Sequence, residues 1–408
     1  MESVNQNTGV YNSNPSGITY YPTSERLLVL AICASIAFPM VDSLVNNYFQ
    51  AAFWDSFFTK GPYFCIILGA TYFAFQRFRS TMIAIPLLVF ALWLFSYSLF
   101  PNNRAALVGE TIVPLATESF PIFIITLAVQ DYRRLYKSLR IAAIIVIICA
   151  TISILLQYGG QFEILYMVFS YSMSSSVLLM AIFSIQNKKK LDIFLTVLGV
   201  IIVFISGARG ALIGIIGGFV FYLLINFNFS IKKVFLMTLF IIFIIYLSAN
   251  YLILIQYLND YLLDKNITSR TIQLILREEM SNSGGRDVLF NKSWIAINDS
   301  FFIGNGMAGD RNILGVYTHN LFTELLLEYG FILGSVFIIT LVIYLLKALF
   351  VKIKDEQYYI FIALFFTTGF LKLQFSFSYL MEPTFFMMLA LAITLTNKNR
   401  NFSNQINI

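Results

Sequence analysis

Long apolar segments separated by short polar connections make up most of this 408-residue chain. A helix needs roughly 20 predominantly apolar residues to cross the hydrocarbon core of a bilayer, which is about 30 Å thick. The pattern predicts an all-α, polytopic integral membrane protein of about 12 transmembrane helices. The predicted spans are residues 27–45, 59–76, 81–100, 106–129, 139–157, 164–185, 191–206, 210–227, 234–255, 331–350, 358–372 and 376–395, of which 191–206 and 358–372 are short.

The composition agrees with this interpretation. Hydrophobic residues make up 58% of the chain and charged residues 12%, whereas soluble domains have about 45–50% and about 25%. Residues 1–25 are polar and lack the pattern of a cleaved signal peptide. Cys33, Cys65 and Cys149 fall inside predicted spans, so we interpret them as small apolar residues and not as a disulfide or metal-binding set.

Basic residues are distributed unevenly between the two predicted sides of the membrane. The termini and the connections after spans 2, 4, 6, 8 and 10 carry 17 of the 27 lysines and arginines, whereas the short connections on the other side carry four. The other six lie in one long loop, where charge has little influence on orientation. Because cytoplasmic connections are enriched in basic residues, both termini are predicted to be cytoplasmic. The net charge of +6 is thus a topology signal and not a nucleic-acid-binding surface.

This topology divides the chain into five predicted segments. They are a cytoplasmic polar N-terminus (1–25), transmembrane helices 1–9 (26–255), an extracytoplasmic loop (256–319), an amphipathic helix with transmembrane helices 10–12 (320–395), and a cytoplasmic tail (396–408). The loop contains seven acidic and six basic residues, so it has no overall field that would attract polyanions. Within it, residues 268–280 and 286–298 are predicted to form amphipathic helices at the membrane surface.

Three candidate functional residues from remote segments fall on the same, extracytoplasmic side. Arg209 lies at the outer end of SGARG (206–210), Arg286 in GGRD (284–287) begins a predicted helix, and His319, the only histidine, precedes the next helix. The planar fork of arginine suits bidentate binding of phosphate oxygens, so the two arginines favour a pyrophosphate site. A helix N-terminus favours the neutral imidazole that a general base requires.

Each of these residues also has a structural interpretation. Arg209 could extend from a helix end to the interface, Arg286 could be a solvated surface charge, and His319 could be a polar residue at a helix start. One histidine without a cysteine cluster or a paired aspartate motif offers few metal ligands, so we expect no metal and no other cofactor.

Further polar residues lie near the three candidates or inside a span. Glu324 and Glu328 share one face of the helix that follows His319, at an i, i+4 spacing. Glu110 and Glu118 lie within the fourth span, where ionisable residues are functional candidates by default, although pairing with arginine is an equally good interpretation. The candidate supporting residues of the site are Asn320, Glu324 and Arg311.

The stretch from Ser206 to about Phe350 resembles the shared core of the O-antigen polymerase and O-antigen ligase superfamily. The resemblance rests on SGARG in a span, SGGR before a Trp-containing helix, FIGNGMAG in the outer loop, and THNLFTELLLEYGFILG leading into the next span. It covers about a third of the chain. The N-terminal spans agree with the superfamily only in number and hydrophobicity.

The resemblance implies a glycosyltransferase with a fold similar to the membrane-embedded GT-C enzymes. Such proteins transfer sugar chains from an undecaprenyl-pyrophosphate carrier at the periplasmic face of the bacterial inner membrane, without a metal. By matched position, Arg209 and Arg286 would hold the pyrophosphate of the donor, and His319 would accept the proton of the attacking hydroxyl with inversion at the anomeric carbon. The implied partners are carrier-linked oligosaccharide donor and acceptor, the lipid bilayer, a chain-length regulator and a flippase, but no nucleic acid.

Three functions stay open at this point. SGARG and an outer loop that is shorter and less basic than the ligase pattern favour a polymerase that joins carrier-linked repeat units. The first alternative is a ligase that transfers the glycan to lipid A core. The second is a flippase or transporter for lipid-linked sugars, which Glu110 and Glu118 would support as charges along a path through the membrane.

Overall fold

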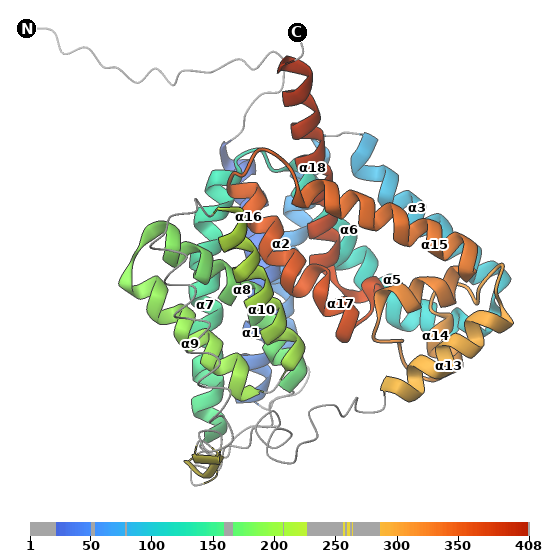
Figure 1. Ribbon diagram of the computed structural model, residues 1–408, viewed down its shortest axis with the longest axis horizontal. Helices are drawn as coiled ribbons and strands as arrows, with labels where there is room; N and C mark the ends of the chain where they lie inside the picture. The colour runs from blue at the N-terminus through green and yellow to red at the C-terminus, as the bar shows by residue number, and fades with distance from the viewer. Residues whose placement is uncertain are drawn as a thin grey trace, which may run out of the picture.

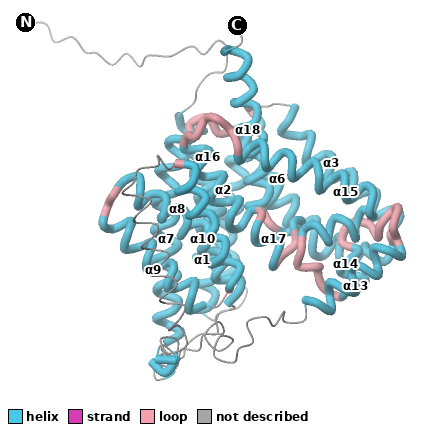
Figure 2. The backbone as a smooth tube through the Cα atoms, viewed as in Figure 1, coloured by secondary structure: helices cyan, strands magenta, loops and turns pink. Residues whose placement is uncertain are grey.

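The structure is a computed structural model, and it is helical, with no strand in the part of the chain that it describes (Figures 1 and 2). The described residues are 22–49, 54–77, 80–158, 166–206, 208–226, a few positions between 256 and 263, and 286–406. The predicted all-α membrane fold is confirmed. The predicted span 234–255 and the predicted helix 268–280 lie outside the described residues.

The predicted spans within the described residues correspond to helix, apart from the start of the last one. Seven helical stretches are long and apolar enough to cross a membrane among the residues described, so the number of twelve stays a prediction. The main helices are α1 (Pro22–Phe49), α2 (Trp54–Phe75), α3 (Ser80–Leu99), α6 (Phe120–Ala128), α7 (Tyr132–Tyr158), α8 (Tyr166–Asn187), α9 (Lys190–Ser206), α10 (Arg209–Ile225), α13 (Arg286–Asp299), α14 (Gly309–Leu314), α15 (Leu321–Leu349), α16 (Glu356–Leu364), α17 (Leu371–Phe375) and α18 (Pro383–Ile406).

The fourth predicted span is a helix with two π-helical turns. It runs from Pro101 to Ala128 and contains the π turns Leu107–Thr111 and Leu115–Ser119. Pro114 and Pro121 lack a backbone N–H, and the ring of each crowds the carbonyl group four residues earlier, so the regular hydrogen-bond ladder cannot continue through them. A π turn closes its hydrogen bond over one more residue than an α turn. Each π turn carries one of the two glutamates of this span.

A sharp reversal divides α15 into the predicted amphipathic helix and the predicted tenth span. Gly330 has φ 75° and ψ 171°, a conformation that only glycine adopts readily. A Cβ on Gly334 would lie 2.7 Å from the carbonyl oxygen of Leu325. In a straight helix these two residues would be roughly 13 Å apart along the axis. The second half of α15 therefore folds back against the first half, and glycine at position 334 permits the close approach.

The last predicted span starts too early in the sequence. Residues 376–395 were expected to be helical, but α18 begins at Pro383. The preceding residues form an irregular segment with one short 3₁₀ turn, Tyr379–Met381. Proline is favoured in the first turn of a helix, where its missing N–H would have no partner, which explains the start at Pro383. The irregular segment contributes one wall of the cavity described below.

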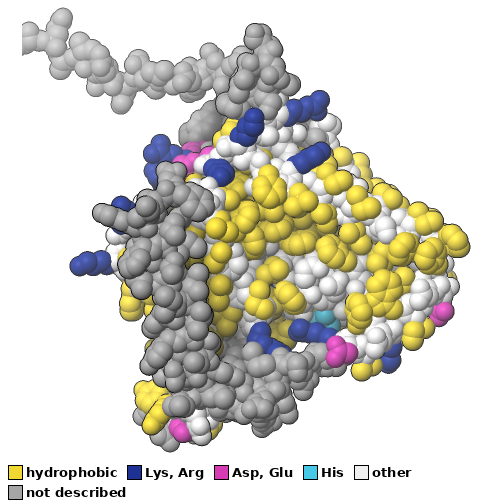
Figure 3. Space-filling view, in the orientation of Figure 1, with side chains coloured by type: hydrophobic (Ala, Val, Ile, Leu, Met, Phe, Trp, Pro, Cys, Tyr) yellow, Lys and Arg dark blue, Asp and Glu magenta, His cyan; other side chains and the backbone are white. Residues whose placement is uncertain are grey.

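Apolar side chains cover the outside of the helical bundle as well as its interior. Along α7, an exposed stripe recurs every three or four residues, at Ile141, Ile145, Ile148, Ile152 and Leu155. Figure 3 shows a continuous hydrophobic belt with basic side chains gathered above it. An exposed apolar area of this extent is what a lipid-facing surface requires.

Buried hydrogen bonds tie the start of α1 to two predicted cytoplasmic connections. Arg77 pairs with Glu25 and donates to the carbonyl oxygen of Ala128 at 2.9 Å. The other oxygen of Glu25 accepts from the backbone N–H groups of Gln130 and Asp131, both at 2.9 Å. The first three predicted cytoplasmic segments therefore lie together at one end of the bundle.

The other predicted cytoplasmic connections join the same end. Tyr136, in the first turns of α7, donates to Gln186 at the end of α8 and packs near Tyr359 of α16. Lys354 donates to the carbonyl oxygen of Ile225 at 2.9 Å, which links the end of α10 to the start of α16. The grouping that the basic residues predicted is thus present in the structure, while the assignment of this end to the cytoplasm stays a prediction.

Arg77→Ala should strongly destabilise the fold, because it leaves the fully buried Glu25 carboxylate without its cation. We expect a loss of about 3–5 kcal/mol in the free energy of unfolding, measured by unfolding of the purified protein in detergent. Lys398→Ala is the control, since Lys398 pairs with Asp355 at a half-exposed position and should cost less than about 1 kcal/mol. Equal losses in the two variants would contradict this interpretation.

Candidate functional site

His319 lies in a strained loop immediately before α15. Its φ of 58° is in the left-handed region, which is uncommon for a residue other than glycine and costs on the order of 1–3 kcal/mol. Both neighbours hold it there: Thr318 donates its N–H to Asp310 at 3.1 Å, and the side chain of Asn320 accepts from the N–H groups of Phe322 and Thr323. Asn320 is thus the N-cap of α15. The predicted position of the imidazole at a helix start is confirmed.

A cavity of about 410 Å³ lies beside the imidazole, within the usual size range of small-molecule sites. Its walls come from α1, α2, α8, α17, the π turn Leu115–Ser119 and the irregular segment before α18. Figure 3 shows His319 next to basic side chains at a hollow below the hydrophobic belt. The polar residues that line the cavity are Ser35, Tyr63, Glu118, Tyr171, Ser172, Ser175, Tyr317, His319, Thr368, Lys372, Ser376, Glu382 and Thr384.

The structure brings Arg286 and His319 together. Arg286 is the first residue of α13, and its positive charge lowers the pKa of His319, in addition to the larger lowering caused by burial of the imidazole. The same charge reaches the hydroxyl of Tyr317, whose ring lies 4.3 Å from that of His319. The two residues were predicted to share one side of the membrane, and in the structure the charge of Arg286 acts on two residues, Tyr317 and His319, that line the cavity.

Arg209 begins α10 and lies near the same cavity. The next residue, Gly210, packs so closely on Tyr171 that a Cβ at this position would come within 2.1 Å of the phenolic oxygen. Tyr171 lines the cavity and is also within reach of the charge of Arg286. Arg209, Arg286 and His319 are therefore grouped around Tyr171, from three segments far apart along the chain.

The surroundings of the imidazole favour its neutral form. Burial of the imidazole and the positive charge of Arg286 both lower the pKa of His319 from its ordinary value, so both favour the neutral form. Its Nδ1 atom is buried and has no hydrogen-bond partner among the described residues. A neutral imidazole on a cavity wall next to a permanent cation can accept a proton from a bound hydroxyl group.

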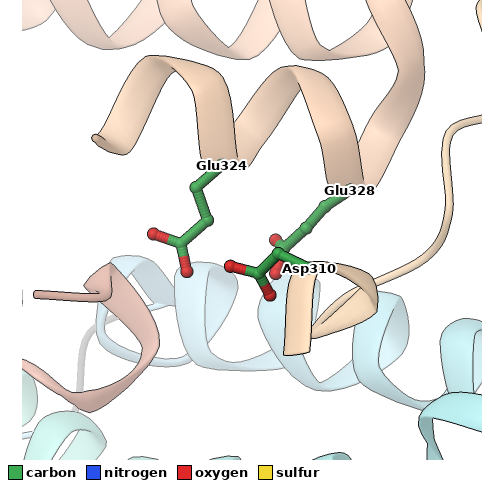
Figure 4. A group of neighbouring side chains, drawn as sticks. All are labelled: Asp310, Glu324 and Glu328. Atoms are coloured by element: carbon green, nitrogen blue, oxygen red, sulfur yellow. The ribbon is translucent and has the colours of Figure 1, made fainter. Parts of the chain in front are cut away.

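Behind the loop, Arg311 is surrounded by three fully buried carboxylates. Its Nη1 atom lies 2.5 Å from Asp310, 3.0 Å from Glu324 and 3.9 Å from Glu328. Figure 4 shows the carboxylates pointing toward one another from α14 and from the first half of α15. Their oxygens lie within 4.8 Å of one another, a group that could hold a metal ion and that the sequence did not reveal. In this structure the guanidinium group provides the positive charge.

Hydrogen bonds connect this buried cluster to the walls of the cavity. Glu328 accepts from the N–H of Ala308 and from the hydroxyl of Tyr379, both at 2.7 Å, and Glu324 accepts from Ser378 at 2.5 Å. Through the bond from Thr318 to Asp310, the cluster also fixes the residue before His319. The predicted supporting residues Arg311, Glu324 and Asn320 therefore hold the His319 loop and do not line the cavity.

Lys372 is a site residue that the sequence did not single out. It lines the cavity beside His319, pairs with Glu382 and lies 4.2 Å from the ring centre of Phe377. In the sequence it is one basic residue of a short outer connection. Its role depends on the irregular segment before α18, which the apolar pattern assigned to a helix.

The structure thus defines a polytopic membrane protein with a polar cavity under a neutral histidine. Residues 194–338, about a third of the chain, match the family model described as O-antigen ligase, so this segment is similar to the O-antigen polymerase and ligase superfamily. The matched segment contains Arg209, Arg286 and His319, and members of the family are membrane enzymes of glycan transfer. No curated protein and no solved structure matches the chain. The predicted resemblance to the superfamily is confirmed over this segment, and the choice between polymerase and ligase stays a prediction.

Because His319 is the only histidine, its titration can be followed directly. Imidazole NMR signals of the purified protein should titrate below pH 6.5, because burial and Arg286 disfavour the charged form. Arg286→Gln should raise the pKa, since it removes a nearby positive charge, whereas Lys292→Gln on the exposed face of α13 should not. Identical titration curves for the wild type and Arg286→Gln would show that the two residues do not interact.

Arg311→Met should destabilise the protein, because it leaves three buried carboxylates without their cation. The expected loss in the free energy of unfolding is about 3–5 kcal/mol, measured in detergent. Arg104→Met is the matched control: this arginine is exposed and donates only to the carbonyl oxygen of Tyr97, so its replacement should cost less than about 1 kcal/mol. An Arg311→Met protein as stable as the wild type would mean that Asp310, Glu324 and Glu328 do not all carry a negative charge in the folded protein.

Proposed function

We propose that this chain is a surface-polysaccharide polymerase that joins undecaprenyl-pyrophosphate-linked oligosaccharide repeat units at the periplasmic face of the bacterial inner membrane. One observation carries the proposal: His319 lines a polar cavity, and burial and the charge of Arg286 lower its pKa. The family match supports a glycan transferase of this superfamily.

In the proposed reaction, a hydroxyl oxygen of the acceptor sugar attacks the anomeric carbon of the donor. The new glycosidic bond forms as the bond from the anomeric carbon to the pyrophosphate oxygen breaks, and the carrier pyrophosphate takes the bonding electron pair. His319 accepts the hydroxyl proton as general base. Attack from the side opposite the pyrophosphate inverts the anomeric centre.

Two arginines suit the leaving group of this reaction. Arg209 and Arg286 begin α10 and α13 and lie near the same cavity. Their charges would bind the pyrophosphate and stabilise the negative charge that develops on it. In this proposal no metal is required for that step. A carrier whose pyrophosphate stays in the headgroup layer would reach these arginines at the outer ends of the helices.

His319→Ala should lower the rate of glycan chain extension by about 10²–10⁴-fold, the usual contribution of a general base. The measurement is the ladder of chain lengths made from purified carrier-linked repeat units by the protein in detergent. Asn312→Ala, at an exposed position of α14, is the control and should extend chains normally. Chains of wild-type length and rate from His319→Ala would refute the assignment of the base.

Two further observations distinguish the polymerase from the ligase and from the transporter. A deletion strain that carries single repeat units on lipid A core indicates a polymerase, whereas the absence of any repeat unit on the core indicates a ligase. Chain extension by the purified protein, without a gradient across a membrane, would show that transport is not needed to explain the loss of long chains in a deletion strain.

A further inference from the structure

The cavity beside His319 reaches deep enough to meet a glutamate of the fourth span. Glu118 lines it together with Ser35, Ser172 and Ser175, hydroxyl groups from α1 and α8. None of these four residues belongs to the matched segment 194–338. The family match therefore assigns nothing to this part of the cavity.

Glu118 is set apart from the other carboxylates of the described chain. The buried acids Glu25, Asp192 and Glu382 each have an ion-pair partner, whereas Glu118, which is half-buried, has no hydrogen bond or ion pair with any described residue. The charged groups that act on it are Glu382, which also lines the cavity, and Lys60 and Asp42, which do not. A carboxylate at membrane depth is costly to keep without a partner, so its presence indicates a ligand with hydrogen-bond donors.

The π turn Leu115–Ser119 presents this side chain to the cavity. Ser119, the next residue, is fully buried, and Thr117 on the same turn donates its hydroxyl to the carbonyl oxygen of Val113 at 2.7 Å. Neither lines the cavity. Among the residues of the turn, Glu118 alone reaches it, and π turns of this kind occur frequently at functional sites.

A second wall of the cavity supplies complementary groups. Lys372 offers ammonium donors and pairs with Glu382, which also accepts from the hydroxyl of Thr384 at 2.5 Å. The aromatic rings of Tyr317 and Phe377 lie 5.9 Å apart on the same wall. A sugar ring needs partners of three kinds. Carboxylates accept hydrogen bonds from its hydroxyl groups, an ammonium group donates to its oxygens, and aromatic faces pack on its C–H groups.

We infer that this cavity is a sugar-binding subsite, in which Glu118 and the Lys372–Glu382 pair bind hydroxyl groups of the repeat-unit sugar next to the reacting bond. The inference rests on the proposed function and extends it to a recognition site outside the matched segment. A polyprenyl chain would fit the apolar part of the cavity but would leave Glu118 without a donor. Glu118 is thus a specificity residue, distinct from the base and the arginines.

The test is binding of the free repeat-unit oligosaccharide, released by mild acid from the carrier that accumulates in a deletion strain. Purified full-length protein in detergent is titrated with it and, separately, with undecaprenyl pyrophosphate that carries no sugar. Glu118→Gln should weaken oligosaccharide binding about tenfold, as expected for loss of a hydrogen bond to a charged group, and should leave binding of the bare carrier unchanged. Glu356→Gln is the control, because Glu356 begins α16, at the end of the bundle where the predicted cytoplasmic connections meet, and does not line the cavity.

Kinetics separate the two sugars that the subsite could hold. The free oligosaccharide can only act as acceptor, so a rise in its KM alone assigns the subsite to the acceptor sugar. A rise confined to the KM of the carrier-linked repeat unit assigns it to the donor sugar. Either result supports a sugar subsite.

Two results would overturn the inference. In one, Glu118→Gln binds the oligosaccharide as tightly as the wild type; in the other, it loses affinity for the bare carrier by the same factor, which would indicate a site for lipid or diphosphate. Failure of the proposed function is seen separately, as normal chain extension by His319→Ala, because sugar binding does not require the base.

Discussion

A single buried guanidinium group, that of Arg311, holds the candidate site in place. It balances three carboxylates that have no contact with solvent. Those carboxylates also accept hydrogen bonds from Ala308, Thr318, Ser378 and Tyr379. An ion cluster of this kind adds little net stability compared with apolar packing, but it becomes very unfavourable when one member is displaced. It therefore specifies one arrangement of the segments that it joins. The unusual backbone conformation of His319 persists because its neighbours have no alternative partners.

Much of the architecture could be predicted from the sequence, because a membrane-crossing helix must be long and apolar and basic residues collect on one side. The same reasoning put Arg209, Arg286 and His319 on one face, and the structure groups them around Tyr171. The break of α15 at Gly330 also followed from the pattern, since the helix before it has a polar face and the helix after it does not.

Other features could not be predicted, because they depend on packing between remote segments. The charge cluster requires Asp310 of α14 to lie beside the glutamates of α15, on the far side of the turn at Gly315. The spacing of apolar residues within each helix does not determine the distance between the two helices. The cavity wall with Lys372 and Glu382 exists because residues 376–382 are irregular, although their composition is apolar enough for a span. The two π turns have no signature beyond the two prolines of the fourth span.

These π turns have a consequence for how such a protein can change over evolutionary time. Each turn accommodates one residue beyond the regular helical repeat, and a residue added to or removed from a helix rotates everything beyond it by about 100°. Deletion of one residue from the fourth span before Glu118 would therefore rotate the Glu118 carboxylate out of the cavity, while the other helices kept their sequence. New glycan preferences could arise by such small length changes in the N-terminal half, with the arginines and the imidazole left untouched.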